Sequence, residues 1–506
     1  MGGKIVKIAK GNYIEKATNI NYYSGGDINT IAGGRINETA GEGIFMGDAE
    51  EAPENNRSRT TPITIESYVE FRPKPNWKGE FGFDWFRNGD YKDSARLFRN
   101  LDYKDVIAKQ YTDSRHRTLE TKANNYKGYF KKNAFLYKNL RNKFKPTKIN
   151  WKYKKDKRGR DLLDASGNPV FDEFLASYLA IFKKETDPDV AVTIQAYIHV
   201  KTAPDELKIQ LEEDQKDFYS VSPLELTKTV TGRKPTKQDI TITCKKPCSR
   251  DRILKVVATT TNAAGVTKKE VVGKLVVKAN DRTHRKTKKI VFVQIKTRLP
   301  RKMGNVGKAV EYNTTNLKKY LRQALIDVHV DSATETLDLG SINVWGTTAN
   351  THFNSKQVRE GEILSSRTAG FLLYYFKEYL KQYKPLEVAK YDDYFKVFIF
   401  DELGYDPRPD TNKAGFASPG KPYTVLLRGS NDQTAAHEIL HSLNLAHTFS
   451  NSEADANAKC TFTHQATDNL LSYTHLKAAT NPAYKTARFS LQHWQWAIAN
   501  AVATSE

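Results

Sequence analysis

The sequence predicts a multidomain protein with a β-helix-like or prism-like leader, a β-sandwich in the middle and an α/β domain at the C-terminus. Three observations predict this class. The chain, at 506 residues, is longer than one ordinary domain. An apolar residue recurs every eight positions near the N-terminus, and strict apolar alternation later gives way to helical spacing. We expect units at 1–55, 56–170, 171–280 and 288–506.

Isoleucines recur every eight residues in the leader, at Ile20, Ile28, Ile36 and Ile44, and glycine pairs separate the first three. An eight-residue period gives one short strand and one turn per repeat. Such a unit cannot bury its isoleucine alone, so it must stack on its neighbours or on another chain. The alternative is a glycine-rich flexible leader.

Residues 56–170 are expected to connect the leader to the sandwich, with a basic helix over 115–144. Residues 101–160 hold nineteen basic and five acidic side chains, and the whole chain carries a net charge of +22. The positive electrostatic field of such an excess of basic side chains favours an anionic partner. No nucleic-acid motif accompanies the charge, so nucleic acid is not expected, and the helix should pack against a sheet.

The region 171–280 shows the pattern of a β-sandwich. Apolar residues alternate strictly through Val190–Val200, which is the period of a half-buried strand. Further strand-like runs follow at 240–242, 254–257 and 271–277, and Asn262-Ala-Ala-Gly265 predicts a hairpin turn. The pattern is typical of an immunoglobulin-like module, which usually serves as a spacer or binding element.

The last domain is expected to alternate strands and helices. Ile290–Ile295 is a continuous apolar run, as in a strand buried on both faces. The remaining elements are helices at 317–325 and 371–383, strands at 397–400 and 423–427, and a C-terminal helix with Leu491, Trp494, Ile498 and Val502 on one side. This order indicates an α/β domain.

One stretch of this domain has the spacing of a catalytic zinc site. His437 and His441 lie four residues apart, so a helix places both imidazoles on one face. Glu438 lies beside them, where it can accept a proton from a zinc-bound water without being a ligand. His447 is the expected third ligand, provided that the helix ends and the chain turns back at Asn444, a residue that tolerates the left-handed conformation.

These residues resemble the metzincin signature H-E-x-x-H-x-x-G-x-x-H, with Asn444 in place of the glycine. A second hallmark of that family, a turn with a methionine beneath the metal, resembles Asp468–Tyr473, where Leu471 takes the methionine position. The resemblance implies a zinc metallopeptidase with Zn²⁺ on His437, His441 and His447, Glu438 as the base and Tyr473 as a further ligand or oxyanion donor. The rival is a carboxylate third ligand, Glu453 or Asp468.

The octad leader, the zinc motif, the segment Val69–Arg87 and the closing Trp494-Gln-Trp496 together resemble spike-associated metallopeptidase effectors of Bacteroidetes-type bacteria. This resemblance implies an effector of type VI secretion that docks through its N-terminus on a trimeric β-helical spike protein. Its other expected partners are a protein or peptide substrate and a cognate immunity or inhibitor protein. It would act outside the producing cell or in a target cell.

Other features of the sequence limit the possible classes of protein. No run of about 18 apolar residues exists, so no membrane span is expected, and the first residues lack the apolar core of a signal peptide. Cys244 and Cys248 are interpreted as structural thiols. Two alternative functions remain: a structural spike-tip or adaptor protein with a weak zinc site, and a nucleic-acid-directed toxin.

Overall fold

The computed structural model describes residues 63–89, 101–112, 115, 128–156, 158–232, 234–300, 305–309, 312–359, 361–364, 369–406, 411–450, 461–474 and 488–505. The expected leader, residues 1–55, lies outside the described residues. The described part is rich in β-strands, which form several sheets, and it contains seven α-helices.

Two sheets form the N-terminal half of the described chain. One has the order β1-β8-β11-β10 and the other β2-β7-β13-β12-β9. They face each other closely, because a Cβ atom at Gly273 would lie 2.7 Å from the Val69 carbonyl oxygen of the opposite sheet. Their strands are β1 (Ser67–Pro73), β2 (Gly82–Asp84), β7 (Ser177–Ala180), β8 (Val190–Val200), β9 (Glu206–Gln210), β10 (Tyr219–Ser222), β11 (Thr236–Cys244), β12 (Arg252–Thr261) and β13 (Thr267–Val277).

The alternating pattern in this half is confirmed as strand structure. Val192, Ile194 and Ile198 of β8 are buried while the intervening Thr193 and Gln195 are partly exposed. The expected hairpin turn also forms, since Gly265 donates to the Asn262 carbonyl with a φ of 78°. Two strands, β1 and β2, come from the region expected to be a connector, and they pair with β8 and β7.

Of the long basic helix expected over 115–144, residues 116–127 lie outside the described residues, and the described part folds differently. Tyr129–Lys132 forms β4, because it pairs with β3 (Ile107–Thr112). The helix α2 spans only Ala134–Asn142, and Asn133 caps its N-terminus by accepting from the Leu136 amide. Here β3 also pairs with β27 (Thr461–Phe462), far along the chain. The neighbouring elements are α1 (Tyr103–Val106), β5 (Thr147–Tyr153) and β6 (Phe171–Phe174).

A mainly parallel sheet forms the centre of the C-terminal half. The strands β14 (Lys286–Thr297), β22 (Phe395–Ile399) and β26 (Tyr423–Leu426) run parallel, and β25 (Gly415–Ala417) pairs antiparallel with β26. Ile290 and Phe292 pack into one hydrophobic core while Val291 and Val293 pack into another. The sheet is therefore buried on both faces, as the continuous apolar run predicts.

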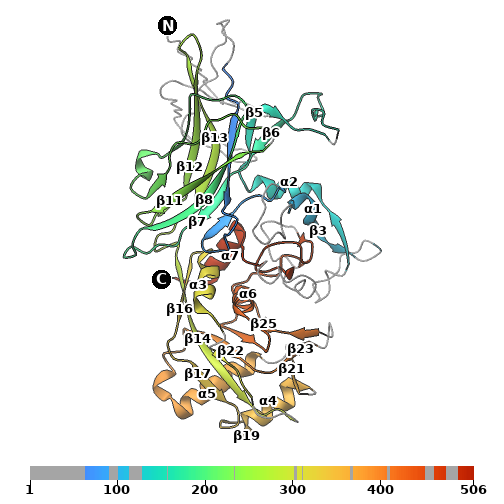
Figure 1. The fold of residues 1–506 in the computed structure, drawn as a ribbon. Coiled ribbons are helices and arrows are strands. Elements are labelled where there is room, and N and C mark those ends of the chain that lie inside the picture. The colour runs from blue at the N-terminus through green and yellow to red at the C-terminus, as the bar shows by residue number, and fades with distance from the viewer. Residues whose placement is uncertain are drawn as a thin grey trace, which may run out of the picture. The chain divides into compact units, whose positions relative to one another are not determined.

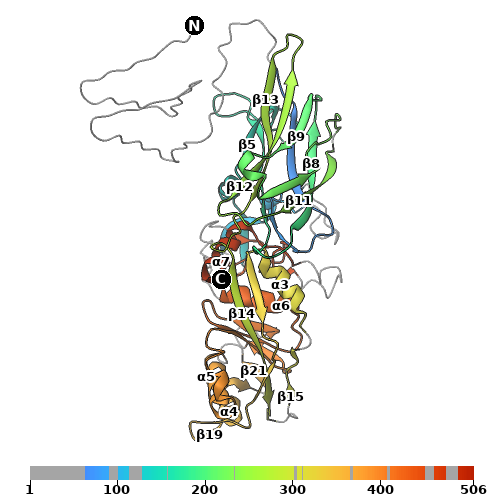
Figure 2. The same cartoon turned by 90° about the vertical axis from the view of Figure 1, so that its left-hand side faces the viewer.

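Helices cover both faces of this sheet, as Figures 1 and 2 show. The helices α3 (Thr314–Arg322) and α6 (Asp432–Ser442) contribute to the first core, and α4 (Ala349–Gln357) and α5 (Ala369–Tyr383) to the second. The closing helix α7 (His493–Val502) buries Trp494 and Trp496. The remaining strands are β15 (Asn305–Val306), β16 (Ile326–Val330), β17 (Glu335–Asp338), β18 (Asn343–Val344), β19 (Thr347–Thr348), β20 (Val358–Arg359), β21 (Glu362–Leu364), β23 (Gly404–Asp406), β24 (Thr411–Lys413) and β28 (Thr504–Ser505).

The helices expected near 317–325 and 371–383, and the C-terminal helix, are thus confirmed within a few residues. No helix in the described ranges is long and apolar enough to cross a membrane. Cys244 and Cys248 are buried free thiols, as expected.

Candidate metal centre

The helix α6 carries the first two histidines. Asn431 caps its N-terminus by accepting from the Thr434 amide, and Asp432 in the first turn accepts from the Asn313 amide and the Asn316 side chain. These contacts fix the helix against α3. Its apolar face is buried in the core, with Ala435, Ala436, Ile439, Leu440 and Leu443 all at most 1% exposed. The opposite side of the helix is thus held in place to present the histidines.

The chain reverses at the residue that the sequence pattern indicates. Asn444 has a φ of 65°, its amide donates to the His441 carbonyl, and the Leu445 amide donates to the Leu440 carbonyl. These two bonds form a Schellman motif, which ends a helix with a left-handed residue. The expected left-handed turn at Asn444 is confirmed, and it directs the chain back toward His447.

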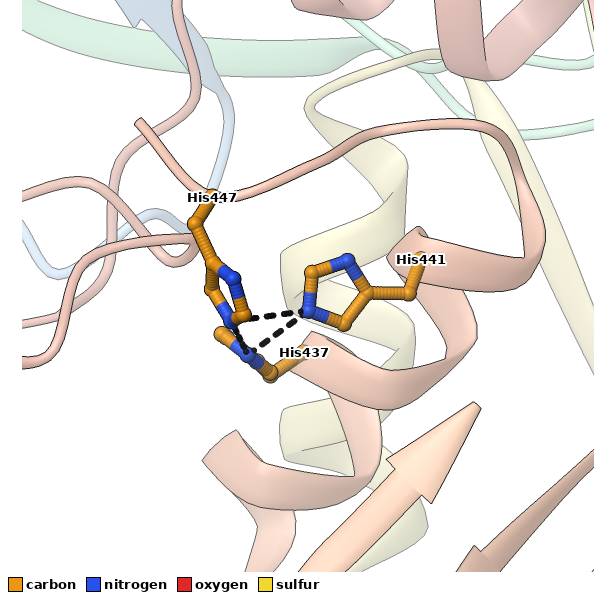
Figure 3. A group of neighbouring side chains, drawn as sticks. All are labelled: His437, His441 and His447. Atoms are coloured by element: carbon orange, nitrogen blue, oxygen red, sulfur yellow. Dashed lines mark hydrogen bonds between the residues drawn. The ribbon is translucent and has the colours of Figure 1, made fainter. Parts of the chain in front are cut away.

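The three histidines converge through their Nε2 atoms (Figure 3). His437 Nε2 lies 3.0 Å from His441 Nε2 and 3.2 Å from His447 Nε2, and 3.1 Å separates His441 Nε2 from His447 Nε2. Nitrogens that bind one tetrahedral zinc ion at about 2.0–2.1 Å stand roughly 3.3 Å apart. The spacing of the triad therefore fits a single small cation, and these residues form the one such group in the described ranges.

Carbonyl groups fix two of the imidazoles in the form that a metal requires. His437 Nδ1 donates to the Leu470 carbonyl at 2.7 Å, and His441 Nδ1 donates to the Leu445 carbonyl at 2.6 Å. A neutral imidazole that donates through Nδ1 has an unprotonated Nε2. Two lone pairs 3.0 Å apart repel each other unless a cation lies between them. These bonds also orient the rings, as second-layer partners of metal-bound histidines commonly do.

Glu438 lies beside the triad and in contact with the edge of the sheet. Its side chain is 7% exposed, and a Cβ atom at Gly415 of β25 would lie 3.0 Å from Glu438 Cγ. Burial raises the pKa of Glu438 to about 8, although the charges of Arg488 and Lys413 act to lower it. A carboxyl group in this environment gains or loses a proton near neutral pH, as a general base requires.

The turn Asp468–Tyr473 lies against the triad and is hydrogen-bonded to it. The Leu470 carbonyl accepts from His437, and Leu471 is fully buried. The ring centroid of Tyr473 lies 4.7 Å from that of His447 and 5.8 Å from that of His437. Asp468 is not in the triad, because its carboxylate pairs with Arg87 and accepts from Ser490. Glu453, the other rival ligand, lies outside the described residues.

Arg488 is a neighbour of the site that the sequence does not reveal. It is 2% exposed, and its Nη1 lies 3.5 Å from His437 Nδ1. Both nitrogens carry hydrogens, because Nδ1 donates to Leu470, so this approach is a contact between two donors. Burial lowers the pKa of Arg488 to about 10, which leaves it charged at neutral pH beside Glu438. No motif surrounds Arg488, and only the fold brings it here.

Burial lowers the pKa of His441 to about 4 and holds the pKa values of His437 and His447 well below their ordinary range. The unfolded chain, with imidazole pKa values of about 6.5, then binds more protons below that pH. The contribution of the three neutral imidazoles to the free energy of unfolding is therefore fully present above about pH 6.5 and is lost as the pH falls toward 4. Glu438, with its raised pKa, acts in the opposite direction, but three imidazoles outweigh one carboxyl group.

We therefore expect the metal-free protein to lose thermal stability steadily between about pH 6.5 and 4. Melting temperatures in the presence of a chelator measure this. The variant His441→Asn should show a shallower profile, whereas replacing the exposed His329 should leave it unchanged. A flat profile for the wild-type protein over this interval would contradict the burial of neutral imidazoles.

The sequence matches no protein-family model, and a search of curated proteins gives no significant similarity. The arguments for function therefore rest on the geometry of the centre.

Proposed function

We propose that this protein is a zinc-dependent metalloendopeptidase of metzincin-like architecture, with an immunoglobulin-like sandwich beside the catalytic domain. One observation carries the proposal: three Nε2 atoms lie 3.0–3.2 Å apart, and two of them are held unprotonated by carbonyl acceptors. Imidazole ligands suit zinc, and three protein ligands are typical of catalytic rather than structural zinc sites. The buried Glu438 next to His437 supplies the base.

Each residue of the site then has a defined role. His437, His441 and His447 would hold the ion through neutral imidazoles, which would not reduce its charge. Zinc in such a site acidifies a bound water and polarises a carbonyl group. Glu438 accepts the proton of the attacking water and passes it to the leaving amine. Tyr473, whose ring lies against His447, is the candidate donor to the developing oxyanion.

The sheet edge beside Glu438 supports a peptide as the substrate. In the described sheet β25 is the terminal strand, paired on one side with β26. A free strand edge offers backbone donors and acceptors to an extended chain. A Cβ atom at Gly415 would lie 3.0 Å from Glu438 Cγ, so a peptide along β25 would pass close to the base.

The test is to measure zinc content and peptide cleavage together. We expect about one zinc per chain and cleavage of a peptide library, lost with a chelator and restored by zinc. Mass spectrometry of the products would define the cleavage preference. A protein that binds one zinc and cleaves no peptide would favour the spike-tip or adaptor alternative, which Leu471, Asn444 and the large non-catalytic part of the chain favour. The toxin alternative would require salt-dependent DNA binding.

We also propose that the octad leader docks the protein on a trimeric β-helical spike of a contractile secretion system, and that the protein is exported with the spike. Repeats that cannot bury their isoleucines alone support this. Deleting residues 1–50 should abolish export and co-purification with a spike protein, and zinc content should not change. Normal export of the truncated protein would contradict docking and favour a flexible leader.

A further inference from the structure

A buried ion-pair network lies between the sandwich and the metal centre. Arg87 follows β2 and is 3% exposed. Its Nη1 donates to Asp84 Oδ1 at 2.8 Å, and its Nη2 lies 3.3 Å from Asp468 Oδ2. The guanidinium carbon also lies 3.4 Å from the ring centroid of Trp85. A buried arginine in such a network is held tightly, because removing a partner leaves an uncompensated charge.

The partner of Arg87 belongs to the turn that orients a metal ligand. Asp468 Oδ1 accepts from Ser490 Oγ at 2.9 Å, and the Leu470 amide donates to the Ser490 carbonyl at 2.9 Å. The Leu470 carbonyl in turn accepts from His437 Nδ1 at 2.7 Å. A continuous series of bonds therefore joins Arg87 to the ring of His437, although 381 positions separate Arg87 from Asp468.

A second contact joins the same two parts of the chain. His493, at the start of α7, donates to Asp84 Oδ2 through its backbone amide at 2.9 Å, and its ring stacks on Tyr178 of the sandwich. Asp84 thus binds Arg87 with one oxygen and α7 with the other. The segment that contains Asp84 and Arg87 therefore contacts the elements around the metal centre and does more than link two domains.

We propose that Arg87 is a positioning residue of the metal centre, which holds the Leu470 carbonyl through Asp468 and so fixes the orientation of His437. The proposal rests on the metal site of the proposed function but does not require peptidase activity. Two results follow. Loss of the Arg87–Asp468 pair should weaken metal binding, and replacing both residues should have no larger effect than replacing one.

The experiment measures Zn²⁺ affinity of the full chain by competition with a chromophoric chelator, for wild type, Arg87→Gln, Asp468→Asn and the double variant. Outer-layer partners of metal ligands typically change affinity by about 10- to 100-fold. Because Arg87 and Asp468 act through the Leu470 carbonyl and do not bond to His437 themselves, we expect each single variant to weaken binding by about tenfold, the lower end of this range, and the double variant to be no weaker than either. The Co²⁺ absorption spectrum should also change, because it reports ligand geometry.

Arg72→Gln is the matched control. Arg72 is 2% exposed and pairs with the buried Glu70 within the sandwich. It should lower the melting temperature but leave Zn²⁺ affinity unchanged. If Arg87→Gln does not fold, Asp468→Asn carries the test, because Arg87 then keeps Asp84 as its partner.

Unchanged Zn²⁺ affinity and an unchanged Co²⁺ spectrum in folded variants, or fully additive effects in the double variant, would overturn the positioning role. If instead the wild-type protein binds zinc and these variants bind it more weakly, but no peptide is cleaved, the inference stands and the peptidase proposal fails.

Discussion

The variant Glu438→Gln should bind zinc as the wild-type protein does and lose peptide hydrolysis by about 10²- to 10⁴-fold, the usual contribution of a general base. Glutamine keeps the shape of the side chain against Gly415, and the three histidines are untouched. It cannot accept the proton of the attacking water. Single-turnover cleavage of a peptide and zinc content of the same preparation measure the two effects.

The same substitution should stabilise the metal-free protein. The pKa of Glu438 is raised by burial to about 8, so its contribution to stability is present below the unfolded pKa of about 4.5 and is lost as the pH rises through 8. Glutamine has no charge to bury. Above pH 8 the melting temperature of the metal-free variant should therefore exceed that of the wild type by a few degrees.

Glu402→Gln is a matched control. Glu402 is 2% exposed, burial raises its pKa, and its carboxylate accepts from Thr297 away from the histidines. This variant should keep both zinc and activity. Wild-type cleavage by Glu438→Gln would show that Glu438 is not the base, and equal losses in both variants would indicate a structural effect.

Local patterns were sufficient for much of the fold. Alternation identified β8, and the three- and four-residue spacing identified α3 and α5, because each pattern depends on neighbours within one element. The continuous run at Ile290 identified a strand buried on both faces. The domain types of the two facing sheets and of the half that contains the three histidines are still proposals.

Long-range pairing could not be predicted in the same way. The Tyr129–Lys132 strand contains apolar and basic residues that fit a helix equally well, and its pairing with β3 decides the outcome. Similarly, β1 and β2 belong to the sheets only because β8 and β7 lie beside them. Contacts such as Arg87 with Asp468 also cross the expected boundary at residue 288, so independent folding of 288–506 is still a prediction.

The candidate site also contains residues placed by local sequence pattern and residues placed only by long-range contacts. His437, His441 and Asn444 belong to one helix and its cap, so their arrangement follows from spacing alone. Leu470 and Arg488 come from segments distant in the sequence, and they reach His437 only through the tertiary fold. The group of histidines was therefore predictable, and the neighbours that contact His437 from elsewhere in the fold were not.

His447→Ala should lower zinc affinity by on the order of a hundredfold or more, since structural zinc sites gain about 10–16 kcal/mol from four ligands and each tenfold change is about 1.4 kcal/mol. His437 and His441 alone leave the ion with two protein ligands. Their Nε2 atoms would remain 3.0 Å apart on α6, so the variant should still bind zinc weakly. Dialysis against a buffered zinc series, followed by metal analysis, measures the change.

His464→Ala is the matched control for this prediction. The ring of His464 lies 4.6 Å from that of Phe449, and the ring of Phe449 stacks on His447 at 4.8 Å, yet His464 is not a member of the triad. It should keep zinc and most of the activity. Unchanged zinc affinity in His447→Ala would show that another group completes the site, and a carboxylate such as Glu453 would then be the next residue to replace. Equal losses in the two variants would mean that aromatic packing around Phe449, rather than ligation by His447, holds the ion.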